Sequence, residues 1–107
     1  KPAKTKFDID ELDIQINSSP IPEFNVNNIY QTNELIKLDA SLSSDSDGKI
    51  INYKWFINDK FYSSNKIDEI RLQNEGVYNI KLLVEDDSET SNRFAILTKT
   101  IQINNNK

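Results

Sequence analysis

Short runs of alternating hydrophobic and polar residues recur along most of the chain. In the clearest run, Tyr78, Ile80, Leu82 and Val84 are spaced two residues apart. A period of two places one set of side chains on one face of a strand, so each run predicts a strand with one buried face. The same alternation occurs at Phe24 and Val26, at residues 36–40, at residues 53–57, and at Ile70 and Leu72.

The hydrophobic residues of the last run lie first on one face of an extended chain and then on the other. They are Phe94 and Ile96 on the first face, and Leu97, Ile101 and Ile103 on the second. One extra residue in a strand reverses the faces of the residues that follow it. The pattern therefore predicts a β-bulge near Thr98 or Lys99.

Turn-forming residues separate these runs. They lie at residues 43–48, 63–65, 73–76 and 86–92, where Ser, Asn, Asp and Gly accumulate. No stretch of a dozen residues keeps a period of 3.6, which argues against a substantial helix. Several short strands at regular spacing predict an all-β fold, either a sandwich or a small barrel.

The length of 107 residues fits one domain. Pro20 and Pro22 interrupt the chain after an alternating stretch near its start, because proline cannot donate a ladder hydrogen bond. We expect an N-terminal linker or edge segment at residues 1–19, a β-sandwich at residues 20–104 and a tail at residues 105–107. Since the chain contains no Met, we also expect it to be a segment of a longer protein.

Composition argues against several kinds of chemistry. The absence of Cys removes disulfides and thiol nucleophiles, and the absence of His removes the usual general base and the commonest transition-metal ligand. A net charge of -4 with scattered basic residues argues against nucleic-acid binding. The apolar runs are too short to insert into a membrane. Without a nucleophile or a glycine-rich phosphate loop, the sequence predicts no enzyme activity.

An ordered series of landmarks runs through the middle of the chain. The acidic turn at residues 43–48 leads to Tyr53-Lys54-Trp55, and Gly76-Val77-Tyr78 leads to the long alternating run that ends at Asp86. Over about residues 22–103, these landmarks resemble the PKD (polycystic kidney disease) family of immunoglobulin-like domains. The resemblance implies an immunoglobulin-like antiparallel β-sandwich of about seven strands.

One segment departs from the family pattern. Family members usually continue after the Trp with Asp-Phe-Gly-Asp-Gly, whereas Trp55 is followed by Phe56-Ile57-Asn58-Asp59-Lys60. Asn and Asp tolerate a left-handed backbone conformation. We therefore expect Asn58-Asp59 to form the turn in place of the family's glycines.

The acidic turn is the strongest candidate site. Ser43, Asp45, Asp47 and Gly48 have the spacing of the first half of an EF-hand calcium loop. The closing Glu of such a loop would fall on residue 54, which is Lys54. The spacing therefore argues against an EF-hand.

The family resemblance implies a different calcium site. Some PKD-like domains bind Ca²⁺ near this turn through acidic residues of adjacent loops, which implies Asp45 and Asp47 as ligands, together with Asp86 or Asp87. The alternative is that these Asp and Ser residues form Asx and Ser turns. We favour the turns, because Ca²⁺ takes about 6–8 oxygen ligands and the sequence names only three or four.

Two aromatic residues have positions typical of an immunoglobulin-like core. Trp55 shares its parity with Tyr53 and Ile57, so we expect a buried Trp rather than a sugar-stacking one. Tyr78 follows Gly76 by two residues, which favours a tyrosine corner whose hydroxyl bonds to the backbone.

Three other aromatic residues are candidates for partner binding. Phe56 has the outward parity on its strand, and Phe61 and Tyr62 follow the next turn. They predict an exposed aromatic patch for a protein or glycan. Packing of the same residues against a neighbouring strand or domain is the alternative.

The resemblance implies a non-catalytic module of a larger extracellular, cell-surface or periplasmic protein of bacterial type. Its expected role is that of a spacer or of a contact with protein or carbohydrate, as in adhesion. The expected partners are neighbouring domains of the same chain. The alternatives are a substrate-targeting or ligand-sensing accessory domain of a secreted hydrolase, and a purely structural tandem repeat. Ca²⁺ is the one cofactor that the sequence suggests.

Overall fold

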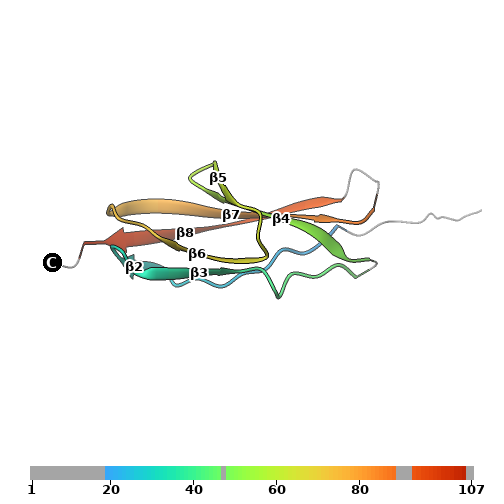
Figure 1. Ribbon diagram of the computed structural model, residues 1–107, viewed down its shortest axis with the longest axis horizontal. Coiled ribbons are helices and arrows are strands. Elements are labelled where there is room, and N and C mark those ends of the chain that lie inside the picture. The colour runs from blue at the N-terminus through green and yellow to red at the C-terminus, as the bar shows by residue number, and fades with distance from the viewer. Residues whose placement is uncertain (1–18, 47, 89–92, 106–107) are drawn as a thin grey trace, which may run out of the picture.

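A computed structural model describes residues 19–46, 48–88 and 93–105 (Figure 1). These residues form seven strands and no helix. The strands are β2 (Ile29–Gln31), β3 (Leu35–Asp39), β4 (Ile50–Ile57), β5 (Lys60–Ser63), β6 (Ile67–Arg71), β7 (Gly76–Asp86) and β8 (Phe94–Asn104). Nothing within the described ranges is a helix of the length and apolarity that crossing a membrane requires.

The strands form two sheets. The larger sheet has five strands in the order β2-β8-β7-β4-β5, and the smaller one pairs β3 with β6. All pairs are antiparallel except β2 with β8, which is parallel. Figure 1 shows β3 and β6 lying along one face of the larger sheet. This arrangement is the predicted immunoglobulin-like β-sandwich.

The core lies between the two sheets. Trp55 is fully buried, and its ring meets Phe24 edge to face with 5.2 Å between the ring centroids. The Trp55 indole N–H donates to the backbone carbonyl of Asn65 over 2.8 Å, so the polar end of the ring is satisfied. The prediction of a core Trp is confirmed. The remaining buried hydrophobic residues are Tyr30, Ile36, Leu38, Ala40, Ile80, Leu82, Val84, Ile101 and Ile103.

Strand β8 contains no bulge, contrary to the prediction. Its pairing with β7 keeps one register from Gly76 opposite Ile103 to Glu85 opposite Phe94. Phe94 and Ile96 are simply exposed on the outer face of the larger sheet, at 44% and 55%. The hydrophobic pattern changes face along the sequence because these two apolar residues lie on the solvent side of the strand.

The register shifts occur in the two ladders of β4 instead. Its pairing with β7 shifts between Ile50 and Asn52, and its pairing with β5 shifts between Trp55 and Phe56. Each shift adds one unpaired residue and bends the strand locally. The extra residue of the second shift is Tyr62 of β5.

The segment around Phe24 is buried but does not form the predicted strand. Ile21 makes an isolated bridge with Ser44, and no ladder follows along residues 22–28. Phe24 is buried and Val26 packs against the core, so the alternation indicates which side chains are buried. It does not indicate backbone pairing, because an irregular chain laid over a core also alternates.

Two predicted local structures are confirmed. Asn58 and Asp59 have φ values of 50° and 68° and join β4 to β5, as expected for a two-residue hairpin turn with a left-handed backbone. The Tyr78 hydroxyl donates to the carbonyl of Asn74 over 2.8 Å, which is the bond of a tyrosine corner.

The described chain starts and finishes at opposite ends of the sandwich. Near its start, Ile21 pairs with Ser44, beside the loop that follows β3. Near its finish, Asn104 accepts a hydrogen bond from Thr32 at the other end of β8. Figure 1 shows the same separation between the segment that begins at residue 19 and the C-terminal end of the chain. Eleven residues of β8 correspond to about 36 Å at roughly 3.3 Å per residue.

Candidate functional site

Three carboxylates meet at one end of the sandwich, which we call the acidic end. Asp45 belongs to the loop after β3, Asp86 is the last residue of β7, and Asp87 follows it. One oxygen from each residue lies within 4.8 Å of the others. Asp86 is 1% exposed, Asp45 is half-buried and Asp87 is exposed. The cluster therefore spans from the interior to the surface.

Backbone contacts hold the loop after β7 beside the start of β4. Asp87 N–H donates to the carbonyl of Lys49 over 3.1 Å, and Asp86 pairs with Ile50 in the ladder. Asp86 Oδ1 also accepts the N–H of Ser88 over 2.9 Å. Since the contacts with Lys49 and Ile50 join residues that are far apart in the sequence, the fold itself brings the carboxylates together.

Gly48 leaves room for the cluster. A Cβ at this position would lie 2.5 Å from Asp87 Oδ1 and 3.3 Å from Asp45 Oδ2. Any larger residue would displace at least the Asp87 carboxylate. The glycine of the acidic turn is thus explained by the close approach of the two carboxylates.

The donor set suits a hard cation such as Ca²⁺. All three groups are carboxylates, and Ca²⁺ is bound by oxygen atoms, with backbone carbonyls and water completing its shell. Asp45 and Asp86, both named from the sequence, lie within the cluster together with Asp87. Asp47, the remaining candidate, lies outside the described residues. Sequence reasoning left Asp86 and Asp87 as alternatives, whereas the structure brings both to the cluster.

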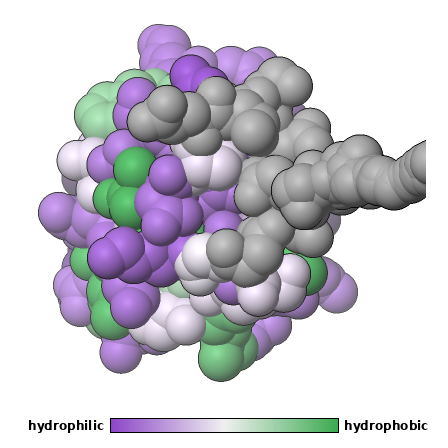
Figure 2. Space-filling model, turned by 90° about the vertical axis from the view of Figure 1, so that its right-hand side faces the viewer, coloured by the Kyte–Doolittle hydropathy of each residue, from purple (hydrophilic) through white to green (hydrophobic). Residues whose placement is uncertain are grey.

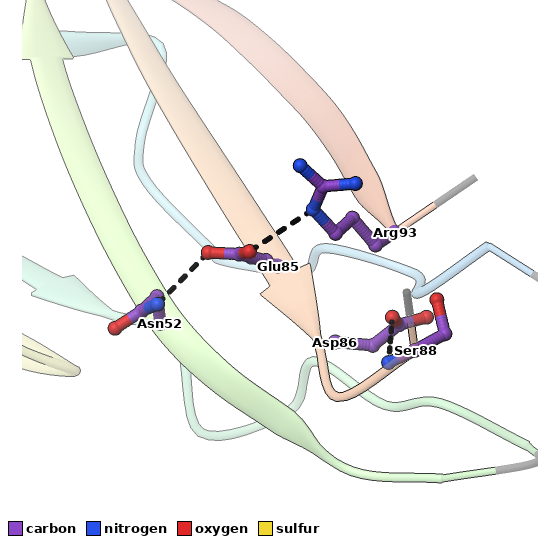
Figure 3. A network of polar contacts seen from close by, with 5 residues as sticks. All are labelled: Asn52, Glu85, Asp86, Ser88 and Arg93. Carbon is purple, nitrogen blue, oxygen red and sulfur yellow. Dashed lines mark hydrogen bonds and ion pairs between the residues drawn. The ribbon is translucent and has the colours of Figure 1, made fainter. Parts of the chain in front are cut away.

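A second polar network lies on the other side of β7 (Figure 3). Glu85 Oε1 accepts the Asn52 amide over 2.8 Å, and Glu85 Oε2 forms an ion pair with Arg93 Nε at 3.3 Å. Arg93 also stacks over the ring of Phe94, 4.6 Å from its centroid. Because successive residues of a strand point to opposite faces, Glu85 points away from the cluster that contains Asp86. This network ties β4, β7 and β8 together on the outer face.

The surface around the acidic end is polar. Figure 2 looks onto this end and shows mostly hydrophilic residues, with hydrophobic residues in small separate groups.

The three aromatic residues named from the sequence do not form one patch. Phe56 and Phe61 are paired across β4 and β5, and their rings meet edge to face with 5.9 Å between centroids. Lys81 Nζ lies 5.8 Å from the Phe56 ring centroid, on the outer face of the sheet. Tyr62 is the extra residue at the register shift, since Phe61 pairs with Phe56 and Ser63 pairs with Trp55. It therefore leaves the row that Phe56 and Phe61 share.

Tyr62 reaches from the edge of the larger sheet to the smaller one. Its hydroxyl donates to the backbone carbonyl of Glu69 on β6. Burial raises the pKa of Tyr62 above its ordinary value, and the nearby carboxylates of Asp68 and Glu69 add to this effect. The phenol therefore stays protonated and keeps its role as a donor at neutral pH.

A groove runs along this edge, which we call the β5–β6 groove. It has a volume of about 390 Å³, and an adjoining depression of about 250 Å³ shares Tyr62 and Ile70 with it. The groove is lined by Ile57, Asn58, Lys60, Phe61, Tyr62, Ile70 and Tyr78, and the adjoining depression by Leu35, Tyr62, Glu69, Ile70 and Arg71. Among the described residues, Phe56 does not line it. Two of the residues named from the sequence, Phe61 and Tyr62, thus line the groove, whereas the register shift at Tyr62 was not expected.

Asp68 forms a group of hydrogen bonds at the same edge. Its Oδ2 accepts hydrogen bonds from Ser63 Oγ over 2.6 Å and from Asn65 Nδ2 over 3.0 Å, and its Oδ1 accepts the N–H of Glu69 over 2.7 Å. These bonds, that of Ser63 foremost, lower the pKa of Asp68 below its ordinary value. The carboxylate therefore remains charged and links the β5–β6 loop to β6.

Comparisons with known proteins agree on the fold. The chain is similar to a structure of carbohydrate-binding modules from the β-sandwich superfamily, with 26% identity and a TM-score of 0.73, over 85% of this chain and 36% of that one. The chain thus spans about a third of the length of that structure.

Two PKD domains from Vibrio have the same fold. The PKD1 domain of Vibrio anguillarum Epp matches with 23% identity and a TM-score of 0.68, over 85% of this chain and 100% of that one. The PKD1 domain of the Vibrio cholerae metalloprotease PrtV matches with 23% identity and a TM-score of 0.66, over 80% of this chain and 98% of that one. The sequence pattern of the PKD domain matches residues 17–101, and the chain therefore belongs to the PKD domain family.

Proposed function

We propose that the chain is a non-catalytic accessory module of a larger extracellular protein, in which it holds neighbouring domains apart. The observation that carries this proposal is the position of Ile21 and Asn104, near the two ends of the described segment, at opposite ends of the sandwich. A chain that comes in at one end and leaves at the other separates its neighbours by the length of the module. The similar PKD1 domain from Vibrio cholerae is part of a metalloprotease, which supports an accessory role within a larger protein.

The acidic cluster gives this role a physical mechanism. Asp45, Asp86 and Asp87 would hold a Ca²⁺ ion, whose charge offsets the repulsion between their carboxylates. Asp45 follows Ser44, which pairs with Ile21 in the incoming segment. An ion bound there would fix the loop against which the incoming segment packs, and it would stiffen the junction with a preceding domain.

The β5–β6 groove supports a second candidate function, that of a contact or targeting domain. The groove combines aromatic and aliphatic walls with a few polar groups, as ligand sites commonly do. The similarity to a structure of carbohydrate-binding modules favours the same role. The two functions are compatible, because the groove lies on an edge of the sandwich, whereas the described segment begins and finishes at its two ends.

The spacer role is tested by placing the module between two compact reporter domains and measuring small-angle X-ray scattering. We expect the reporters to be separated by the length of the module, about 36 Å along β8. A control with a Gly/Ser linker of the same number of residues should give a broader distribution of distances. Reporters that lie side by side would contradict the proposal. Addition of Ca²⁺ should narrow the distribution for the module and leave the linker control unchanged.

A further inference from the structure

We infer that the β5–β6 groove binds sugar rings of an acidic glycan. This inference rests on the contact role proposed above and names the class of its ligand. The residues that line it include three aromatic ones, Phe61, Tyr62 and Tyr78, together with the aliphatic Ile57 and Ile70. The apolar faces of pyranose rings pack on such surfaces, and a volume of about 390 Å³ lies in the range of ligand pockets.

The hydrogen-bonding groups of the groove suit hydroxyls. The phenols of Tyr62 and Tyr78 donate to the carbonyls of Glu69 and Asn74, so toward a ligand their oxygens can act only as acceptors. The ammonium group of Lys60 acts only as a donor. A ligand that uses both kinds of group must donate and accept at neighbouring positions, which sugar hydroxyls do.

The edges beside the groove disfavour an added peptide strand. A peptide that extends a sheet needs free backbone groups along an edge strand. On β6, the N–H of Glu69 is bonded to Asp68 Oδ1 over 2.7 Å, and the carbonyl of Glu69 accepts the hydroxyl of Tyr62. On β5, the register shift at Tyr62 interrupts a strand of only four residues. Recognition through side chains is therefore favoured over pairing of main chains.

The charges that line the groove favour an anionic ligand. Lys60 is the charged residue of the main groove, and the adjoining depression adds Arg71 and Glu69. Glu69 and the neighbouring Asp68 carboxylate offset Arg71, so the positive charge among the described residues of this surface lies at Lys60 in the main groove. A glycan that carries carboxylates, such as a polymer of uronic acids, complements Lys60 of the main groove better than a neutral glycan does.

The test uses tetragalacturonate and its methyl ester, which has the same rings without the charges. Isothermal titration should detect binding of the acid, weakened about 2- to 5-fold by esterification, as expected for an exposed ion pair. Phe61→Ala should weaken binding of the acid roughly 3- to 10-fold through loss of a ring contact. The matched control is Phe94→Ala, which removes another exposed Phe from outside the groove and should leave binding unchanged. In Lys60→Gln, the acid and the ester should bind equally.

Several outcomes would overturn the inference. Equal binding of acid and ester by the unmodified protein would refute the acidic class, and equal losses in Phe61→Ala and Phe94→Ala would place binding elsewhere. Binding of an extended peptide at this groove in place of either oligosaccharide would leave the contact role standing and refute the glycan. Absence of binding to both oligosaccharides would also refute it, while the spacer role is decided separately by scattering.

Discussion

Replacing Asp87 with Asn should change stability in opposite directions with and without Ca²⁺. Without the ion, three carboxylates whose oxygens lie within 4.8 Å of one another repel. In the parent protein, the N–H of Lys49 donates to Asp87 Oδ1 over 3.4 Å. The substitution removes one charge and leaves an amide oxygen that can still accept this hydrogen bond. We therefore expect the apo variant to be more stable than the apo parent protein.

The magnitude follows from the distances. Two unit charges 4.8 Å apart interact by about 1 kcal/mol at the dielectric constant of water, which is the appropriate choice for the exposed Asp87. For a domain of this size, about 1 kcal/mol shifts the melting temperature by roughly 4–8 °C. A ligand at a hundredfold excess over its Kd adds about 2.7 kcal/mol to the stability of the folded state. The parent protein should therefore gain roughly 10–20 °C on Ca²⁺ addition, and Asp87→Asn should gain far less.

The assay is thermal unfolding followed by circular dichroism, in EDTA and in millimolar Ca²⁺. Asp59→Asn is the matched control, because Asp59 has an 81% exposed side chain and lies in the β4–β5 turn. It should respond to Ca²⁺ as the parent protein does. Equal destabilisation of Asp87→Asn in both buffers, or the same melting temperature of the parent protein in both, would contradict a calcium site at this cluster.

Three further substitutions test local features. Asp59→Gly should raise the melting temperature by roughly 2–4 °C, because glycine tolerates the φ of 68° at little cost and the exposed ion pair with Lys81 contributes little; a decrease would contradict this. The pKa of Asp68 is lowered chiefly by the bond from Ser63, so its stabilisation is present above pH 3.8 and lost as the pH falls through the lower folded-state value. Asp68→Asn should flatten the acid-induced loss of stability below about pH 4 in urea titrations, and an unchanged pH profile would refute it. Tyr78→Phe removes the corner hydrogen bond and should cost about 1 kcal/mol in urea unfolding, whereas an unchanged midpoint would show that the bond contributes nothing.

Local patterns predicted the parts of the fold that depend on neighbouring residues. The turn at Asn58-Asp59 follows from the backbone preferences of Asn and Asp, and the corner at Tyr78 follows from its spacing to Gly76. The burial of Trp55 follows from its parity within a strand. Each of these features is decided within a few residues, so one sequence is enough to predict it.

Other features depend on contacts between distant segments, and the sequence could not show them. Asp45 and Asp87 approach each other where the loop after β7 is bonded to Lys49, and the family resemblance rather than any local pattern named them together. Phe94 is hydrophobic but exposed, and taking it for a buried residue led to the wrong prediction of a bulge in β8. The position of Tyr62 depends on a register shift that alternation alone does not reveal.

The most direct test of the spacer role is the distance between the two ends of the module. The sequence contains no Cys, so Ser19→Cys and Asn105→Cys would carry two spin labels without further substitutions. Pulsed electron paramagnetic resonance should give a distance of about 30–40 Å, the length of the eleven-residue strand β8. A narrow distribution in that range is the predicted result, whereas a distance below about 20 Å would place both ends together and contradict the account.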